Sequence, residues 1–223
     1  MASIETRAAA AGAAARGWRV RPLTLAKLFV FGACSLPLVL LALRASGIAG
    51  ESLGPNPTEA VMDVLGKWGL RLLLVTLAIT PLRVTFAAPL LLGLRRMLGL
   101  FAFTYVTMHF LVWLTLDRWL DFAAVLEDIA KRPFITVGMT ALLLLIPLAI
   151  TSTRGWMRRL GRRWQRLHRL IYPAAILGCV HYWWQVKADL REPLLYATVL
   201  LLLLGWRVHR ARASARARAP SPG

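Results

Sequence analysis

The sequence predicts an all-α protein, a polytopic membrane helical bundle of about six transmembrane helices with both termini in the cytoplasm. Three observations predict it: apolar runs that reach bilayer length, basic residues that gather in alternate segments between those runs, and histidines inside two of them. Hydrophobic residues make up 58% of the 223 residues, and the mean hydropathy is +0.59. A single soluble core of this size could not enclose so much apolar surface, so a membrane is the expected solvent.

Six apolar runs approach or reach the roughly 20 helical residues that cross about 30 Å of hydrocarbon. They lie at residues 28–43, 61–82, 97–116, 134–151, 167–186 and 193–208. The chain therefore divides into a disordered basic cytoplasmic tail at 1–27, a transmembrane domain at 28–208 and a second basic cytoplasmic tail at 209–223. The alanine stretch near the N-terminus is too weakly apolar to form the core of a secretory signal.

The formal charge of +18 first suggests a nucleic-acid partner, but the distribution of the charge excludes one. Of the 28 basic residues, 20 fall in the two tails and in the second and fourth loops, whereas Glu5 is the only acid on that side. These 20 are Arg7, Arg16, Arg19, Arg21, Lys27, Arg83, Arg95, Arg96, Arg154, Arg158, Arg159, Arg162, Arg163, Arg166, Arg169, Arg207, Arg210, Arg212, Arg216 and Arg218. The positive-inside rule places this side, and with it both termini, in the cytoplasm, as in a multi-pass inner-membrane protein.

Histidines in the third and fifth spans are the strongest functional signal, because ionisable residues inside a bilayer are costly and tend to mark function. His109 lies 13 residues after Arg96, and His181 lies 12 residues after Arg169. Both spans run outward, so the two imidazoles are expected at nearly the same depth in the outer half of the membrane. Facing each other across a bundle, they could supply both axial ligands of a haem iron. The alternative is that each forms a hydrogen bond between helices.

His168 precedes His181 by 13 residues, which places it about 20 Å lower, near the inner interface, and roughly 140° around an ideal helix. Pro173 lies between them and removes a backbone hydrogen bond, so a kink could change this phase. Two interpretations of His168 stay open, an inner metal ligand or a helix-bridging residue. Cys34 and Cys179 fall inside predicted spans and form no C-x-x-C-H motif, so they are expected to be buried small residues rather than sites of covalent haem attachment.

Several segments resemble the MsrQ (YedZ) family, whose members are haem-binding membrane subunits of a bacterial periplasmic methionine sulfoxide reductase system. The segments are Ile79-Thr80-Pro81-Leu82, Arg95-Arg96-Met97-Leu98-Gly99-Leu100, Arg132-Pro133-Phe134, Thr151-Ser152-Thr153, Trp164-Gln165-Arg166-Leu167-His168 and His181-Tyr182. The similarity runs in order and spacing from about Leu53 to Arg210. Through this family the chain also resembles the ferric reductase transmembrane superfamily, and residues 28–208 would be its haem-binding domain.

The resemblance implies a particular set of ligands, since the superfamily holds two stacked haems with histidine pairs on its third and fifth spans. The fifth-span pair maps onto His168 and His181, and the outer third-span ligand maps onto His109. The inner third-span position is Arg95, whose guanidinium stays protonated and is a poor iron ligand. One or two haem b groups are therefore implied, with Arg95 beside any inner one and FMN as a further candidate cofactor. Arg71 has two interpretations, a partner for an outer haem propionate or a cation that snorkels to the interface.

The expected function is that of a b-type cytochrome that passes electrons across the inner membrane. The expected donor is the quinone pool or a cytoplasmic flavin reductase, and the acceptor implied by the resemblance is a periplasmic molybdopterin methionine sulfoxide reductase of the MsrP type. Catalysis on methionine sulfoxide would then belong to that partner, and membrane lipid would surround the chain. The alternatives are a transporter or channel, for which symmetric broken spans or intramembrane acids would be expected, and a structural membrane anchor without redox activity.

Overall fold

The computed structural model of the chain describes residues 22–48, 53–186 and 188–217, and every regular element in these ranges is helical. The α-helices are α2 (Pro22–Ala45), α3 (Pro57–Thr85), α4 (Leu92–Val112), α5 (Phe122–Lys131), α6 (Pro133–Ile150), α7 (Arg154–Leu160), α8 (Arg162–Leu167), α9 (Ile171–Gln185) and α10 (Arg191–Arg216). Short turns of other helix types are η1 (Pro89–Leu91), η2 (Trp113–Asp117) and η3 (His168–Leu170). The prediction of an all-α protein is confirmed for the described residues.

Each of the six predicted spans falls on a helix, and four stretches are long and apolar enough to cross a membrane. These four are α2, the run from η1 through α4 to η2, α6 and α10. Helix α9 has only 15 residues, although α8 and η3 lead directly into it. Pro173 has no N–H for the carbonyl of Arg169, so the turn just before it tightens into a 3-10 helix.

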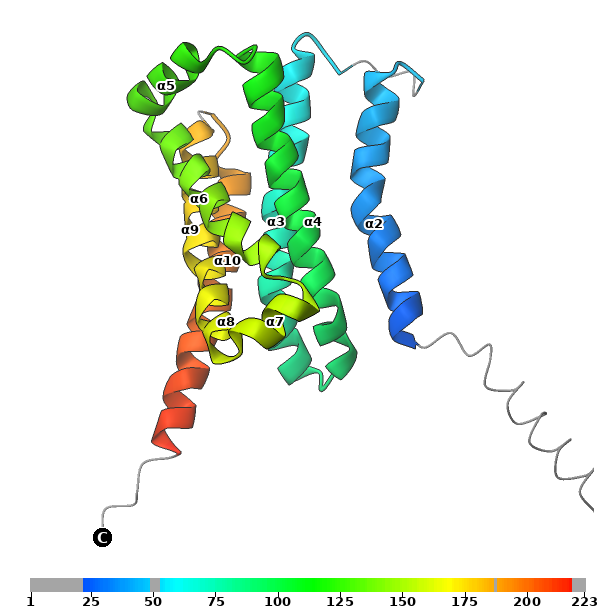
Figure 1. Cartoon of the computed structure of the whole chain (residues 1–223), viewed down its shortest axis with the longest axis vertical. Coiled ribbons are helices and arrows are strands. Elements are labelled where there is room, and N and C mark those ends of the chain that lie inside the picture. Colours follow the sequence, from blue (N-terminus) through cyan, green and yellow to red (C-terminus); the bar gives the residue numbers. More distant parts are fainter. Residues whose placement is uncertain (1–21, 49–52, 187, 218–223) are drawn as a thin grey trace, which may run out of the picture.

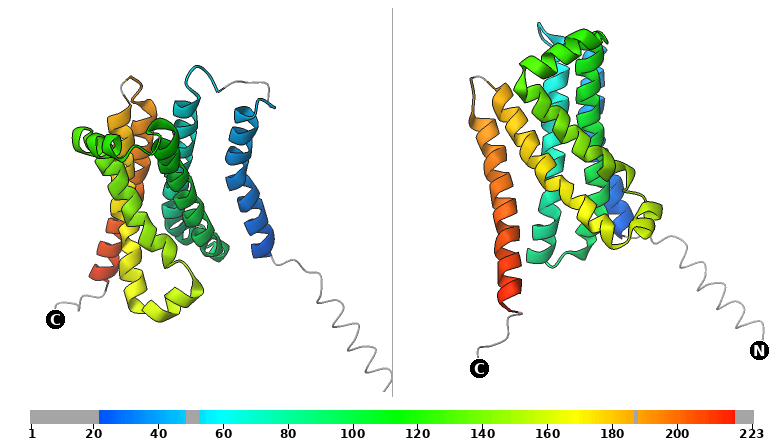
Figure 2. Two further views of the ribbon diagram at one scale, coloured as in Figure 1. Left: turned by 45° about the horizontal axis from the view of Figure 1, so that its top comes forward. Right: turned by 60° about the vertical axis from the view of Figure 1, so that its left-hand side comes forward.

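Four of the helices form two antiparallel pairs, and two more helices pack against these pairs. Helix α3 lies along α4, and α6 lies along α9, while α10 packs against both α3 and α9 (Figures 1 and 2). Helix α2 packs against α4: the Tyr105 hydroxyl donates to the Cys34 carbonyl at 2.7 Å, and the Phe31 and Phe101 rings lie 5.3 Å apart edge to face. The two cysteines are buried, as expected.

The two ends of the bundle differ in charge. The start of α2, the end of α10 and the short helices α7 and α8 lie at one end, and α5 lies at the other (Figure 1). The arginines of α7, α8 and the last turns of α10 therefore gather at a single end, as the alternating pattern predicted. Residues 1–21 and 218–223 lie outside the described residues. The division into tails stays a prediction, although α2 begins at Pro22 and α10 continues to Arg216.

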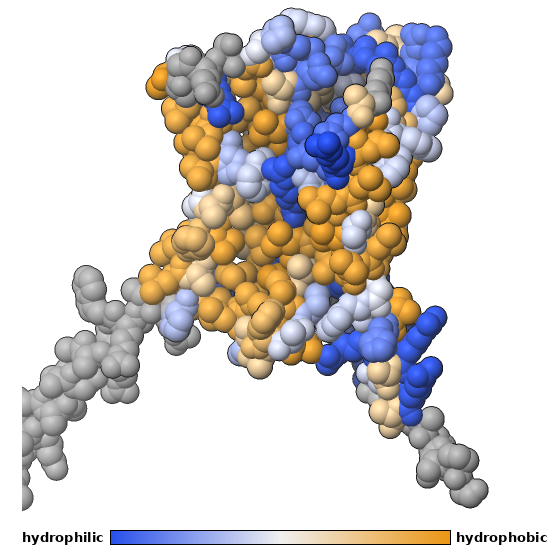
Figure 3. Space-filling view, turned by 180° about the vertical axis from the view of Figure 1, so that it is seen from behind, coloured by the Kyte–Doolittle hydropathy of each residue, from blue (hydrophilic) through white to orange (hydrophobic). Residues whose placement is uncertain are grey.

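Apolar side chains cover the waist of the molecule. Figure 3 shows a hydrophobic belt with hydrophilic residues toward both ends. Large apolar side chains are exposed, including Phe29 at 78%, Leu201 at 70% and Leu202 at 69% exposure. Contiguous apolar surface of this kind is not tolerated in water, so the belt is the face that meets lipid.

Helix α5 forms a cap over the end opposite the arginine clusters (Figure 1). Its N-cap is Asp121, whose carboxylate accepts hydrogen bonds from the Ala123 and Ala124 amides. Its buried Asp128 contacts Arg118 at 2.6 Å and Arg132 at 3.2 Å. These ion pairs hold the cap against the segments that lead into and out of it.

Candidate functional site

Two histidines face each other inside the bundle. His109 comes from α4 and His181 from α9, and their ring centroids lie 6.1 Å apart with the ring planes at 81°. The sequence predicted that these two imidazoles lie at one depth, and the structure brings them together. The two rings belong to the two different helix pairs, so the site lies at the junction of the pairs.

Each imidazole is oriented by a backbone carbonyl. The Nδ1 atom of His109 lies 2.8 Å from the carbonyl oxygen of Met62, and that of His181 lies 2.7 Å from the carbonyl oxygen of Phe134. A carbonyl oxygen can only accept, so Nδ1 carries the proton in both rings. Each Nε2 is then left with a free lone pair, which is the arrangement that metal-ligating histidines adopt in proteins.

The same local geometry occurs twice. In both cases the carbonyl precedes its histidine by 47 residues, and a glycine follows the carbonyl by one helical turn. A Cβ on Gly66 would lie 3.1 Å from Nδ1 of His109, and a Cβ on Gly138 would lie 2.7 Å from Nδ1 of His181. The glycines therefore let α3 and α6 approach the imidazoles closely enough for the carbonyl contacts to form.

The two rings project into a cavity of about 730 Å³, within the range of about 300–1,000 Å³ that is usual for cofactor sites. Its walls are mostly apolar and come from α3, α4, α6 and α9. The charged residues in its lining are the cations Lys67, Arg118 and Arg132 and the acids Glu59, Asp63 and Asp117. An enclosure of this kind suits a large, flat, mainly apolar group.

The geometry fits a haem with two axial histidines. A metal-bound imidazole nitrogen lies about 2 Å from the metal, and its ring centre lies about 1 Å further out, so two trans axial rings have centres about 6 Å apart. The observed separation of 6.1 Å between the His109 and His181 centroids matches this value.

His168 does not line this cavity. Its ring lies 3.9 Å from the Trp164 ring, and its Nε2 lies 3.3 Å from the Thr151 hydroxyl. That hydroxyl donates its own proton to the Pro147 carbonyl at 2.6 Å, so His168 Nε2–H is the donor to Thr151. The side chain thus has partners at the arginine-rich end, and its role as an inner ligand stays a prediction.

The two arginines singled out from the sequence lie in different places. Arg95 lies at the arginine-rich end, close enough to His168 and Arg207 for their charges to interact. Arg71 contacts Glu192 at 3.5 Å and Tyr196 at 2.7 Å, and it does not line the cavity. Binding of a cofactor by either residue stays a prediction, and Lys67 is the cation that α3 presents to the cavity.

Sequence reasoning missed several residues that shape this site. Lys67 lies one helical turn before Arg71 on the same face of α3, a spacing that could have drawn attention to it. Gly66 and Gly138 precede their histidines by the same interval, so a search for equal glycine-to-histidine spacings would have found them. The role of the Met62 and Phe134 carbonyls cannot be read from the sequence, because every residue has a backbone carbonyl.

Comparison with known proteins identifies relatives along almost the whole chain. Residues 65–179 match the family described as the ferric reductase like transmembrane component. The chain is 50% identical over 204 residues to a protein of Xanthomonas campestris pv. campestris (strain 8004), a match that covers 88% of this chain and 94% of the relative. A protein of Rhodospirillum rubrum is 53% identical over 199 residues with the same coverage of both chains. Both relatives are named protein-methionine-sulfoxide reductase heme-binding subunit MsrQ.

No solved structure matches the chain. The family assignment therefore rests on sequence similarity. By the identity and coverage of its relatives, the chain belongs to the MsrQ family of ferric reductase-like transmembrane proteins.

Proposed function

We propose that this protein is a haem-binding membrane subunit that delivers electrons to a protein-methionine-sulfoxide reductase. The facing pair His109 and His181 carries the proposal, because both Nε2 atoms are free and the rings are spaced for one iron between them. The names of the relatives support it independently, since they describe a haem-binding subunit of such a reductase. The catalytic partner would be a periplasmic molybdopterin enzyme of the MsrP type.

The residues of the chain have distinct tasks in this function. His109 and His181 would ligate the iron, and the Met62 and Phe134 carbonyls accept hydrogen bonds from Nδ1–H and fix the ring orientations. The apolar walls exclude water. A bound haem supplies reversible one-electron chemistry at the iron, while the protein sets its depth, ligands and surrounding dielectric.

We further propose six spans, with both termini in the cytoplasm. Helices α3 and α9 would then be the second and fifth spans beside the four stretches that have span-like length and composition. The alternating arginines support this orientation through the positive-inside rule. The paired histidines would lie in the outer half, near the periplasmic partner, and His168 would lie near the cytoplasmic face. A second haem and FMN stay predictions.

The direct test measures haem in purified protein by the pyridine haemochromogen method, together with iron. The wild type should contain haem b, and His109→Ala or His181→Ala should each abolish or grossly change the haem while the protein still inserts, because insertion depends on span hydrophobicity. His209→Ala is the matched control, since His209 is exposed near the end of α10. A colourless wild type, or two histidine variants with unchanged haem and spectrum, would overturn the proposal and favour a transporter or a structural anchor.

A further inference from the structure

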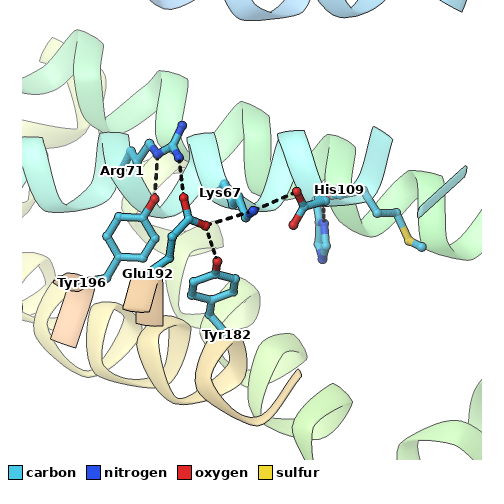
Figure 4. Close-up of polar contacts among 8 residues, drawn as sticks. Lys67, Arg71, His109, Tyr182, Glu192 and Tyr196 are labelled. Carbon is cyan, nitrogen blue, oxygen red and sulfur yellow. Dashed lines mark hydrogen bonds and ion pairs between the residues drawn. The ribbon is translucent and has the colours of Figure 1, made fainter. Parts of the chain in front are cut away.

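The walls of the histidine cavity are tied to one another by polar contacts between helices (Figure 4). The Glu192 carboxylate at the start of α10 accepts a hydrogen bond from the Tyr182 hydroxyl of α9 at 2.7 Å and contacts Lys67 of α3 at 3.0 Å. Lys67 and Tyr182 both line the cavity. The helices that surround the cavity are therefore linked by polar groups as well as by apolar packing.

The cap segment, residues 118–132, lacks such links to α3, α4, α9 and α10. Arg118 and Arg132 line the cavity, and both contact the buried Asp128 of α5. Among the residues that the structure describes, the hydrogen bonds and ion pairs of the cap segment reach no further along the chain than Trp113 on one side and Thr136 on the other. These contacts shape the cap, but they do not tie it to the rest of the bundle.

Helix α5 has three different faces. The buried Asp128 marks the face toward the protein. Phe122 and Leu126 form an apolar stripe, with exposed fractions of 69% and 67%, and Glu127 forms an ion pair with Lys131 on a charged face. An ideal helix turns about 100° per residue, so the three faces are spaced roughly evenly around α5. A helix with protein, apolar and charged faces suits a boundary between lipid and water.

The turn that leads into α5 exposes a tryptophan beside this helix. Trp119 and Leu120 both adopt the left-handed backbone conformation, with φ of 50° and 60°, which is unfavourable for residues other than glycine. The side chain of Trp119 is 81% exposed. Tryptophan is enriched where a membrane meets water, so its place at the start of the cap agrees with an interfacial position.

The position of α5 favours lipid over a protein partner as the occupant of the apolar stripe. The helix projects sideways at the edge of the bundle and stays level with the nearby ends of α3 and α4 (Figures 1 and 2). It therefore overhangs the lipid that surrounds the hydrophobic belt, and its exposed apolar side chains continue that belt.

We propose that α5 is an interfacial helix, whose apolar stripe lies in the lipid boundary and thereby holds the cap on the histidine cavity. The inference rests on the proposed spans, and its effect on the cavity rests on the proposed haem. Lipid on the stripe and water on the charged face fix the rotation of α5. Asp128 then stays beneath the cap, where it holds Arg118 and Arg132 at the cavity wall.

The first test is the depth of spin labels in lipid nanodiscs, measured by electron paramagnetic resonance with oxygen and a water-soluble nickel chelate as relaxing agents. The labels are attached at Leu126→Cys, Glu127→Cys or Leu201→Cys in a background that carries Cys34→Ala and Cys179→Ala. The label at position 126 should lie about 5–10 Å deeper than the label at position 127, which is the depth to which interfacial helices bury their apolar face. Leu201 of α10, 70% exposed in the belt, is the lipid reference.

The second test is the rate at which haem leaves the protein in nanodiscs, followed by its transfer to apomyoglobin. Leu126→Glu places a charge in the apolar stripe and should speed haem loss by about tenfold, because moving one leucine side chain from lipid to water changes an equilibrium constant by about that factor. Phe122→Glu repeats the test at the other position of the stripe. Ala123→Glu is the matched control, since it adds the same charge at an exposed position one turn before Glu127, and it should lose haem at the wild-type rate.

The outcomes separate this proposal from those on which it rests. If the nickel chelate reaches the label at position 126 as readily as the label at position 127, the interfacial helix is overturned and a soluble partner becomes the occupant of the stripe. Wild-type haem loss in both Leu126→Glu and Phe122→Glu overturns the link between lipid and the cap. A Leu201→Cys label in water contradicts the proposed spans instead. A wild type without a Soret band contradicts the proposed haem, and the label depths, which need no haem, still decide the position of α5.

Discussion

Replacement of Gly138 by alanine should disturb the candidate haem site more than its small size suggests. The added Cβ would lie 2.7 Å from Nδ1 and 2.8 Å from Cε1 of His181, whereas ordinary heavy-atom contacts are about 3.5–4.0 Å. The imidazole would have to move by about 0.8 Å or more away from α6. Metal–ligand distances tolerate only about 0.2 Å, and the contact with the Phe134 carbonyl would be lost as well.

The expected result is a loss of haem affinity of about 10–100-fold, which is usual when a group that orients a metal ligand is removed. Gly66→Ala should act in the same direction but more weakly, because its Cβ would lie 3.1 Å from Nδ1 of His109. The assay is titration of the apoprotein with hemin, together with the absorption spectrum of the loaded protein. Size-exclusion chromatography checks that each variant is folded.

Gly205→Ala is the control, since a Cβ on Gly205 of α10 meets no atom within 4 Å. Alanine is also a better helix former than glycine by up to about 1 kcal/mol, so the substitutions themselves should not weaken the helices. The loss of haem affinity should be largest in Gly138→Ala, smaller in Gly66→Ala and absent in Gly205→Ala. This order follows from the distances alone. Wild-type hemin affinity and spectrum in Gly138→Ala would refute the reasoning.

His168→Ala should slow reduction by a cytoplasmic flavin donor in oriented vesicles while it leaves the outer haem spectrum intact, and wild-type rates would exclude His168 from the electron path. Reporters fused after Gly223 or inserted near Gly161 should be active only in the cytoplasm, and a periplasmic signal from either would reverse the orientation. Asp128→Ala should lower the free energy of local unfolding of α5 by about 1–3 kcal/mol, because Arg118 and Arg132 lose their buried partner. Faster proteolysis of the variant within residues 117–132 is the measurement that checks this.

The helices and the depth of the histidines could be predicted because both depend on local information. An apolar run of sufficient length is helical in a bilayer whatever surrounds it, and each of the six runs falls on a helix. The depth of His109 and His181 could be counted from Arg96 and Arg169, which mark the same boundary on two helices. These two counts place the rings at one level, whereas their facing arrangement depends on the rotation of the two helices and is seen only in the structure.

The remaining features of the site depend on tertiary contacts that no single segment encodes. Glu192 lies just before the last predicted span and gave no sign that it would meet Lys67 and Tyr182. The cap helix α5 was not predicted, because only 10 residues form it and its buried Asp128 gains partners only in the folded chain. The arrangement of carbonyl, glycine and histidine is repeated in space, yet too few residues carry it to appear as a sequence repeat.

Electron paramagnetic resonance of the oxidised protein at low temperature tests the central claim most directly. Two axial imidazoles produce low-spin ferric haem, and ring planes near 81° keep two of the iron d orbitals close in energy, which gives a strongly anisotropic signal with one very large g value. This signal is expected in the wild type and should be lost in both His109→Ala and His181→Ala. A rhombic low-spin signal would contradict the observed ring orientation. A high-spin signal, or a low-spin signal that survives both substitutions, would contradict the claim that His109 and His181 hold the haem.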